Sequence, residues 1–154
     1  MNEFPQLQAI QQLGRTYRAL MSAFESNIGH TMPRWRILLT LYQSGERSQK
    51  ELARALLIDP AALTRQIQVI ERQGWIERHS DAKDNRLTNV ALTAAGREIV
   101  DAALPRRAAF IERAFGDLSH EQMGMLSTML QTLEHGLQQA GADRAGTADA
   151  AGET

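Results

Sequence analysis

Apolar residues recur at every third or fourth position through most of this chain of 154 residues. That spacing is typical of α-helices with one buried face. Pro33 suits the first turn of a helix, where its missing N–H has no partner to lose, and Thr93 and Ser119 are residues that cap a helix start. The pattern therefore predicts four long helices, over residues 6–28, 33–44, 94–115 and 119–139.

Two shorter helices are predicted between the second and the third of these. Ser48 and Glu51 form a capping box, in which each side chain binds the backbone N–H of the other residue. Asp59 followed by Pro60 is a second start signal, and Gly74 ends the pattern that follows. We expect these helices over residues 49–57 and 60–73.

The stretch GWIERHSDAKDNRLTNVALT, residues 74–93, interrupts the helical pattern. Its β-branched and aromatic residues with partial alternation predict two antiparallel strands, 75–78 and 87–92, joined by a charged tip. A hairpin directly after two short helices is typical of a winged helix, whose wing places cations against DNA. The alternative is that the charged tip only solubilises a turn, with Asp84 and Arg86 pairing locally.

The helix expected at 60–73 begins with the small side chains Ala61 and Ala62. Short side chains at the start of a helix let its backbone approach the major groove, which is about 12 Å wide. Thr64, Arg65 and Gln66 would then reach base edges. The two short helices are interpreted as a helix-turn-helix, and the alternative is a pair of amphipathic helices with a purely structural role.

Composition limits the classes of protein that fit this chain. With 43% hydrophobic and 23% charged residues, it has an ordinary globular composition. The absence of Cys excludes disulfides, cysteine nucleophiles and thiol-based redox sensing. No apolar run is long enough to span a membrane and no signal peptide is recognisable, so we expect a soluble cytoplasmic protein. Four scattered histidines give little support for a metal site, and none is expected.

Charge is unevenly distributed, although the formal net charge is only -1. Residues 1–111 carry 15 Lys or Arg against 11 Asp or Glu, whereas residues 112–154 carry 2 against 7. Phosphate binding depends on the local placement of cations, so the excess in the first part is compatible with a nucleic-acid partner. A solvated surface of mixed sign fits the same charges equally well.

Catalytic signatures are missing from the sequence, which has no HExxH, phosphate loop, G-x-S-x-G or dinucleotide fingerprint. We therefore expect a protein that is not an enzyme. A winged-helix module that docks onto other proteins, without sequence-specific DNA binding, stays open as an alternative function. It fits the neutral balance of residues 59–86, which contain five cations and five acids.

The run from Ser48 to Leu92 resembles the MarR family of winged-helix transcriptional regulators. The segments TMPRWRILLTL before it and TAAGREIV after it match the family's second and fifth helices, so the resemblance covers about residues 7–137. Its most specific parts are Thr64-Arg65, the helix exit ERQGWIER at 71–78, Asp84-x-Arg86, and Leu92-Thr93-x-x-Gly96.

The resemblance implies a mainly α fold, a winged helix-turn-helix whose N- and C-terminal helices form a dimerisation domain. It implies a DNA-binding domain at 33–99 and a helical dimerisation region at 1–32 and 100–139. Residues 140–154 have little apolar content and are expected to be a disordered tail. The protein would then be a ligand-responsive repressor that binds a palindromic double-stranded DNA operator as a homodimer. The alternative for the terminal helices is packing within one chain.

Roles on DNA are expected for twelve residues. Bases would be read by Thr64, Arg65 and Gln66, with Pro60 and Ala61 close by. Phosphates would be held by Ser48, Gln49, Gln68 and Arg72. The wing would act through Lys83 and Arg86, with Asp84 orienting Arg86.

MarR-type proteins typically release DNA when a small, often aromatic anion binds between the DNA-binding lobe and the dimer helices. No other cofactor is expected, and the effector would be a small aromatic acid such as a hydroxybenzoate, hydroxycinnamate or hydroxynicotinate. His30 stands where the family commonly has an apolar residue, and an ionisable ring there could orient a carboxylate. The alternative is a surface histidine at a helix junction. The expected lining is Arg15, Tyr17, Arg18, Met21, His30, Met32, Trp35 and Arg36.

Overall fold

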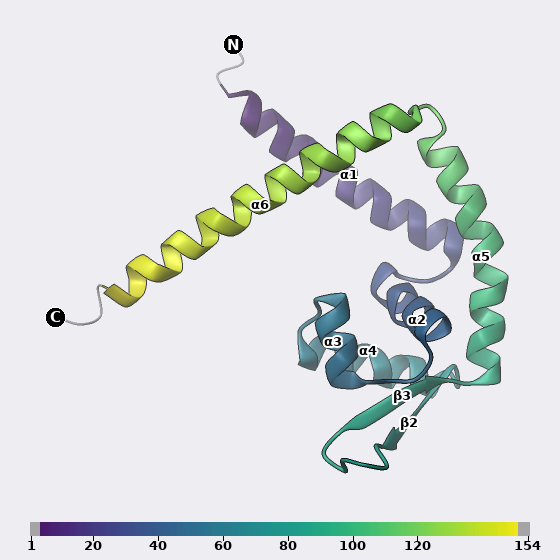
Figure 1. Cartoon of the computed structure of the whole chain (residues 1–154). Coiled ribbons are helices and arrows are strands. Elements are labelled where there is room, and N and C mark those ends of the chain that lie inside the picture. The colour runs from purple at the N-terminus through teal and green to yellow at the C-terminus, as the bar shows by residue number, and fades with distance from the viewer. Residues whose placement is uncertain (1–3, 151–154) are drawn as a thin grey trace. The chain divides into compact units, whose positions relative to one another are not determined.

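The computed structural model describes the backbone of residues 4–150 and the side chains of residues 4–142. The chain divides after Ile111 into two compact units. All six predicted helices are present (Figure 1), and all but the last begin and end within a few residues of their expected ends. The helices are α1 (Pro5–Ile28), α2 (Met32–Ser44), α3 (Gln49–Leu56), α4 (Pro60–Arg72), α5 (Ala94–Phe115) and α6 (His120–Ala150).

The hairpin predicted after α4 is confirmed, and it belongs to a small antiparallel sheet of order β1-β3-β2. Strands β2 (Ile76–Ser80) and β3 (Thr88–Leu92) pair along their whole length, with Arg78 opposite Val90. Strand β1 (Arg47–Ser48), which lies just before α3, adds a short third strand to the outer edge of β3. Two residues are too few to produce an alternating pattern, so the sequence contained no signal for β1.

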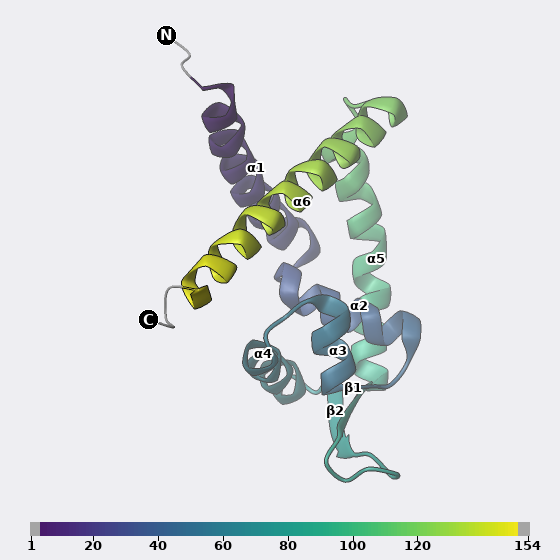
Figure 2. The same cartoon turned by 60° about the vertical axis from the view of Figure 1, so that its left-hand side comes forward.

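The core of the first unit is made by the predicted apolar stripes of α2, α3 and α4, which close over β3 and α5. Figures 1 and 2 show α3 and α4 side by side against α2, with the hairpin extending from them. Phe24 of α1 meets Phe110 of α5 edge to face, with ring centroids 6.0 Å apart, so both long helices join this core. The largest fully buried side chains are Ile28, Ile37, Leu38, Leu41, Leu52, Leu63, Ile67, Ile70, Val90 and Val100.

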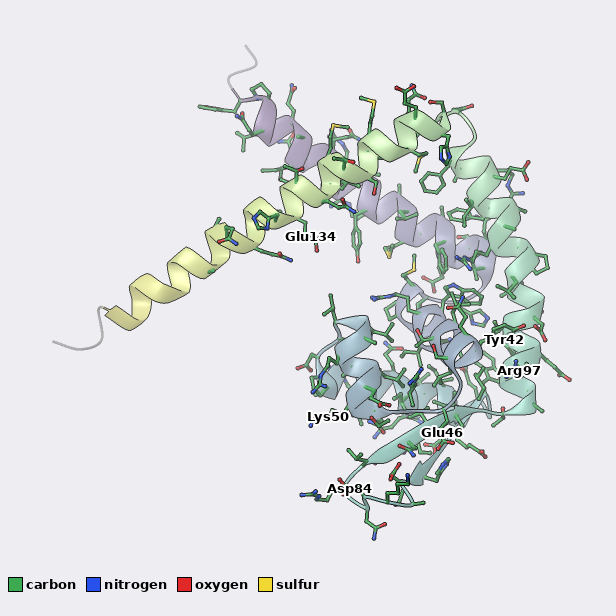
Figure 3. All side chains as sticks on the ribbon, viewed as in Figure 1. Tyr42, Glu46, Lys50, Asp84, Arg97 and Glu134 are labelled. Atoms are coloured by element: carbon green, nitrogen blue, oxygen red, sulfur yellow. The ribbon has the colours of Figure 1, made fainter. Side chains whose placement is uncertain are left out.

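A polar contact joins the far end of α2 to α5. The Tyr42 hydroxyl donates to Asp101 Oδ1 at 2.6 Å. The Arg97 guanidinium lies over the Tyr42 ring, 5.0 Å from its centroid (Figure 3). The hydrogen bond to the Asp101 carboxylate raises the pKa of Tyr42 above its ordinary value. This contact holds the start of α5 against the winged-helix core.

The Leu92-Thr93-x-x-Gly96 motif joins the wing to α5. The Thr93 hydroxyl donates to the Gly74 carbonyl at 2.6 Å and accepts from the Gly96 N–H at 3.0 Å, so one side chain caps α5 and binds the end of α4. A Cβ on Gly96 would lie 1.9 Å from the Trp75 carbonyl oxygen. Only glycine allows α5 to start this close to the turn before β2.

The expectation of a disordered tail from residue 140 is wrong for residues 140–150, because α6 continues to Ala150. Low apolar content argues against a packed core, but it does not prevent a formed helix from growing. This segment is rich in alanine, the best helix former, and extending an existing helix avoids the cost of nucleation. Residues 151–154 lie outside the described residues. Neither α6 nor any other helix in the described part of the chain is long and apolar enough to cross a membrane.

Candidate nucleic-acid interface

Helix α4 presents one polar face to solvent. At 100° per residue, Leu63, Ile67 and Ile70 point to one side of the helix, and all three are buried. Ala61, Arg65, Gln68 and Arg72 occupy the opposite side, and all four are exposed. All four were predicted to contact DNA. The exposed face of α4 therefore has a small residue, Ala61, in its first turn and polar or cationic residues further along.

Thr64 lies on the flank of this face that borders α3, and its hydroxyl is hydrogen-bonded within the chain. It donates to the Pro60 carbonyl at 3.0 Å, one helical turn earlier. It also accepts from Gln49 Nε2 at 3.1 Å, which ties the first turn of α3 to α4. Thr64 and Gln49, predicted to contact a base and a phosphate, thus contact each other.

Gln66 is separated from the other predicted base readers. It is half-buried and lies on the flank of α4 opposite Thr64, about 200° around the helix. Pro60 is exposed in the first turn of α4, next to the cap Asp59, whose Oδ2 accepts from the Ala62 N–H at 3.1 Å. If α4 lies straight in a groove with its exposed face toward DNA, Pro60 and Thr64 are therefore closer to the DNA than Gln66.

The capping box at the start of α3 is confirmed. Ser48 Oγ accepts from the Glu51 N–H at 3.1 Å, and the Ser48 N–H donates to Glu51 Oε2 at 3.0 Å. Ser48 is only 7% exposed and its side chain caps α3, and its contact with a phosphate stays a prediction. The capping box thus engages the Ser48 hydroxyl, the same group that was predicted to bind a phosphate.

The wing tip is organised by two aspartates. Asp81 Oδ1 accepts from the backbone N–H groups of Lys83 and Asp84 at 2.8 and 2.9 Å, and Oδ2 accepts from Asn89 Nδ2 at 2.8 Å. These bonds, with the one from Asn89 first, lower the pKa of Asp81. The loop is thus tied to β3 and holds a defined shape.

Asp84 and Arg86 are paired, as predicted. Arg86 Nε donates to Asp84 Oδ1 at 3.0 Å and a terminal nitrogen donates to Oδ2 at 3.3 Å. Arg86 is the principal cause of the lowered pKa of Asp84. The Arg86 side chain remains 91% exposed, so the pair fixes its direction without covering it. Both the orienting role and the simple local ion pair are compatible with this geometry, and the DNA contacts of Lys83 and Arg86 stay predictions.

Two cations that the sequence analysis did not select border the helix-turn-helix. Lys50 and Arg54, one turn apart on α3, line an open groove of about 460 Å³. The opposite wall includes Pro60, Leu63 and Thr64 of α4. Figure 3 shows Lys50 at the end of α3 that faces the wing and Asp84 on the wing itself. A phosphate backbone that follows α4 would pass these cations.

A second polar cluster surrounds His30, between α1 and α2. The His30 ring is 7% exposed, stacks on Trp35 with centroids 6.5 Å apart, and meets Trp75 edge to face at 5.4 Å. The alternative of a surface histidine is therefore wrong. Burial lowers the pKa of His30, and the cations Arg34 and Arg106 lower it further. Within the part of the chain with described side chains, His30 Nδ1 and Arg34 Nε are buried without a hydrogen-bond partner.

The structure brings only some of the predicted effector residues to this cluster, among them Trp35, whose ring stacks on His30. Arg15, Tyr17 and Arg18 are exposed on α1, and Met21 and Met32 are half-buried. Arg36 donates to the Leu56 carbonyl at 2.9 Å, at the end of α3, so its guanidinium is engaged by the helix-turn-helix. Their roles in binding an effector stay predictions.

Known proteins are similar to this chain in sequence and in fold. The family model described as MarR family matches residues 30–88, from the start of the His30 cluster to the start of β3. The uncharacterized HTH-type transcriptional regulator YdgJ of Bacillus subtilis is 29% identical over 128 residues, covering 83% of this chain and 78% of YdgJ.

Residues 30–88 therefore form a MarR-family domain. The HTH-type transcriptional repressor IacR of Pseudomonas putida is 25% identical to this chain over 122 residues, covering 79% of this chain and 73% of IacR. The crystal structure of AbsC, a MarR family transcriptional regulator from Streptomyces coelicolor, matches with a TM-score of 0.77 at 25% identity, covering 86% of this chain and 94% of AbsC. The protein is therefore a transcriptional regulator and not an enzyme.

Sequence reasoning missed four residues that the fold places at the two sites. Lys50 and Arg54 had a local signal, since they are cations four residues apart on an exposed helix face. Arg34 and Arg106 had none, because α5 comes to the start of α2 only in the folded chain. An added Cβ on Gly29 would lie 3.8 Å from the Arg106 guanidinium, which places this cation beside the turn that carries His30.

Proposed function

We propose that this regulator is a repressor that binds a palindromic operator as a homodimer and releases it when a small aromatic carboxylate binds beside His30. The observation that carries the DNA part of the proposal is the exposed face of α4 opposite the buried Leu63, Ile67 and Ile70. Arg65 is available there for base edges in the major groove, and Arg72 for phosphates. The repressor role is supported by the likeness to IacR.

Dimer formation is supported by apolar side chains that a single chain leaves in water. On α1, Ile10 is 55% and Tyr17 is 61% exposed. On α6, Met129 is 59% and Leu137 is 58% exposed, along a stripe with Leu130 and Leu133. A second copy of the chain would cover such stripes, since contiguous exposed apolar surface is typical of interfaces. A two-fold dimer would also set its two α4 helices about 34 Å apart, as one turn of DNA requires.

The effector site is supported by the unpartnered polar atoms around His30. A carboxylate would accept from Arg34 and neutralise the local positive charge of Arg34 and Arg106. The rings of Trp35 and Trp75 offer apolar faces and edges to an aromatic ligand. His30, kept neutral by its surroundings, would supply either a donor or an acceptor to a ring hydroxyl or nitrogen of the ligand.

The DNA proposal is tested by selecting bound duplexes from a random DNA pool with the purified protein and measuring affinity for the enriched sequence against salt. We expect a palindromic sequence and a steep loss of affinity as salt rises, with a slope of about −0.9 for each phosphate contacted. An unenriched pool, or binding that ignores salt, would contradict the proposal. A protein-docking module without sequence-specific DNA binding would give the first result.

The effector proposal is tested by calorimetry with hydroxybenzoates, hydroxycinnamates and 6-hydroxynicotinate, followed by operator binding at saturating acid. One of these acids should bind and lower the affinity for DNA. Arg106→Gln should lower the affinity for that acid. It should leave the affinity for DNA in the absence of acid unchanged, because Arg106 lies outside the exposed face of α4. If every acid fails to bind, the effector class is wrong.

A further inference from the structure

The state of the Thr64 hydroxyl bears on how α4 would read DNA. A threonine hydroxyl has one O–H donor and two acceptor lone pairs. The donor is engaged by the Pro60 carbonyl at 3.0 Å, and one acceptor position is filled by Gln49 Nε2 at 3.1 Å. Threonine in a helix often donates in this way to the carbonyl one turn earlier. The polar part of the side chain is therefore largely satisfied before any DNA arrives.

The Cγ2 methyl is the part of Thr64 that forms no hydrogen bond. It belongs to the first turns of α4, where Ala61 is three residues earlier and exposed. Residues three apart are neighbours on a helix, so the Ala61 and Thr64 methyl groups form a small apolar surface beside Arg65. In the major groove, the group that such a surface complements is the C5-methyl of thymine.

We propose that Thr64 reads the operator with its methyl group, by contacting the C5-methyl of a thymine in each half-site, while its hydroxyl stays bound to Pro60 and Gln49. The inference rests on the proposed function, in which α4 enters the major groove. It adds to that function the identity of the base, thymine, that Thr64 selects. Gln49 is a positioning residue in this arrangement. It holds the Thr64 side chain in one rotamer from the neighbouring helix.

The test uses the duplex enriched from the random pool, with each thymine replaced in turn by deoxyuridine, which lacks only the C5-methyl. For the wild-type protein, one thymine per half-site should be sensitive, with about a fourfold loss of affinity per methyl, the factor that about 0.8 kcal/mol represents. The same series is then measured with Thr64→Val, which keeps a methyl and loses the hydroxyl, and with Thr64→Ser, which does the reverse.

We expect Thr64→Val to keep the deoxyuridine penalty at that position and Thr64→Ser to lose it. Arg72→Ala is the matched control, because a lost phosphate contact should lower affinity for both duplexes equally and leave the penalty unchanged. Circular dichroism of all three variants checks that α4 is intact. If Thr64→Ser fails to fold, Thr64→Ala replaces it, and we expect no deoxyuridine penalty for Thr64→Ala either.

Three results would overturn the inference. The penalty could persist in Thr64→Ser, it could vanish in Thr64→Val, or no thymine could be sensitive in the wild-type protein. Each of them leaves an enriched sequence and a salt-dependent affinity in place, so the proposed function survives. If the pool yields no sequence at all, the proposed function fails and the inference fails with it.

Discussion

The guanidinium of Arg36 donates to the main-chain carbonyl of Leu56 at 2.9 Å and so ties the middle of α2 to the last turn of α3. The next residue, Leu57, adopts a left-handed conformation with φ 53°, which is uncommon for a residue with a side chain. Its backbone N–H donates to the Ala53 carbonyl and ends the helix. The turn between α3 and α4 is thus held from α2, the helix that also carries Trp35.

Arg36→Ala should lower the free energy of unfolding by about 1 kcal/mol, the typical net contribution of a hydrogen bond. Urea unfolding followed by circular dichroism measures this change. Because Arg36 braces the turn, the variant should also weaken operator binding while leaving effector affinity near the wild-type value. A large loss of effector affinity without a loss of stability would instead place Arg36 in the effector site.

Gly96→Ala should be strongly destabilising. The added Cβ would lie 1.9 Å from the Trp75 carbonyl oxygen and 3.0 Å from a Leu92 methyl, so the start of α5 must move away from the wing. We expect a loss of about 3 kcal/mol, at the upper end of the cost of overpacking.

Gly124→Ala is the matched control for this substitution. Gly124 lies within α6 with no neighbouring atom within 4 Å of an added Cβ, on the side opposite the exposed apolar stripe. There the change should stabilise the helix by up to about 1 kcal/mol. If Gly96→Ala and Gly124→Ala unfold at the same temperature, the backbone at Gly96 can move away from the Trp75 carbonyl at little cost, which contradicts the prediction.

Stability should fall below neutral pH because of His30. Burial and the neighbouring cations lower its folded pKa below the ordinary value of 6.5, so below that pH the unfolded chain binds more protons than the folded one. The stability attributable to neutral His30 is complete above pH 6.5 and is lost as the pH falls toward the folded pKa. The slope cannot exceed about 1.4 kcal/mol per pH unit for one proton.

The His30 contribution is isolated with His30→Phe, which keeps an aromatic ring beside Trp35 and Trp75. Urea unfolding at several pH values between 7.5 and about 5 should give a flatter curve for this variant than for the wild-type protein. All other titrating groups, including the wing carboxylates, are common to both. Parallel curves would mean that His30 does not titrate differently on unfolding.

Arg65 and Arg72 lie on the same exposed face of α4 but should behave differently on DNA. Arg65→Ala should cost about 1–3 kcal/mol and relax discrimination at one base pair, because a base-edge contact is lost. Arg72→Ala should weaken binding to all sequences alike and reduce the slope of affinity against salt by about one for each subunit. Competition with single-base variants of the selected duplex separates the two, and unchanged discrimination in Arg65→Ala contradicts the assignment.

The helices and the wing could be predicted because their signals are local. A capping box spans four residues, a helical stripe repeats every turn, and the turn residues of the hairpin are adjacent in the chain. The same local reasoning failed at residues 140–150. It treated low apolar content as evidence against a helix, although a helix that is already formed extends through alanine-rich sequence without further burial.

The sequence by itself determined the six helices as far as residue 139, the hairpin, the winged-helix order of elements and the resemblance to the MarR family, since each depends on neighbours a few positions apart. Only the tertiary structure decided which side chains are free. It engages Arg36 with the Leu56 carbonyl, joins Gln49 to Thr64, and brings Arg106 of α5 close to His30. The physical reason is that hydrogen bonds and burial depend on distances between residues far apart in the chain, and a periodic pattern contains no such distances.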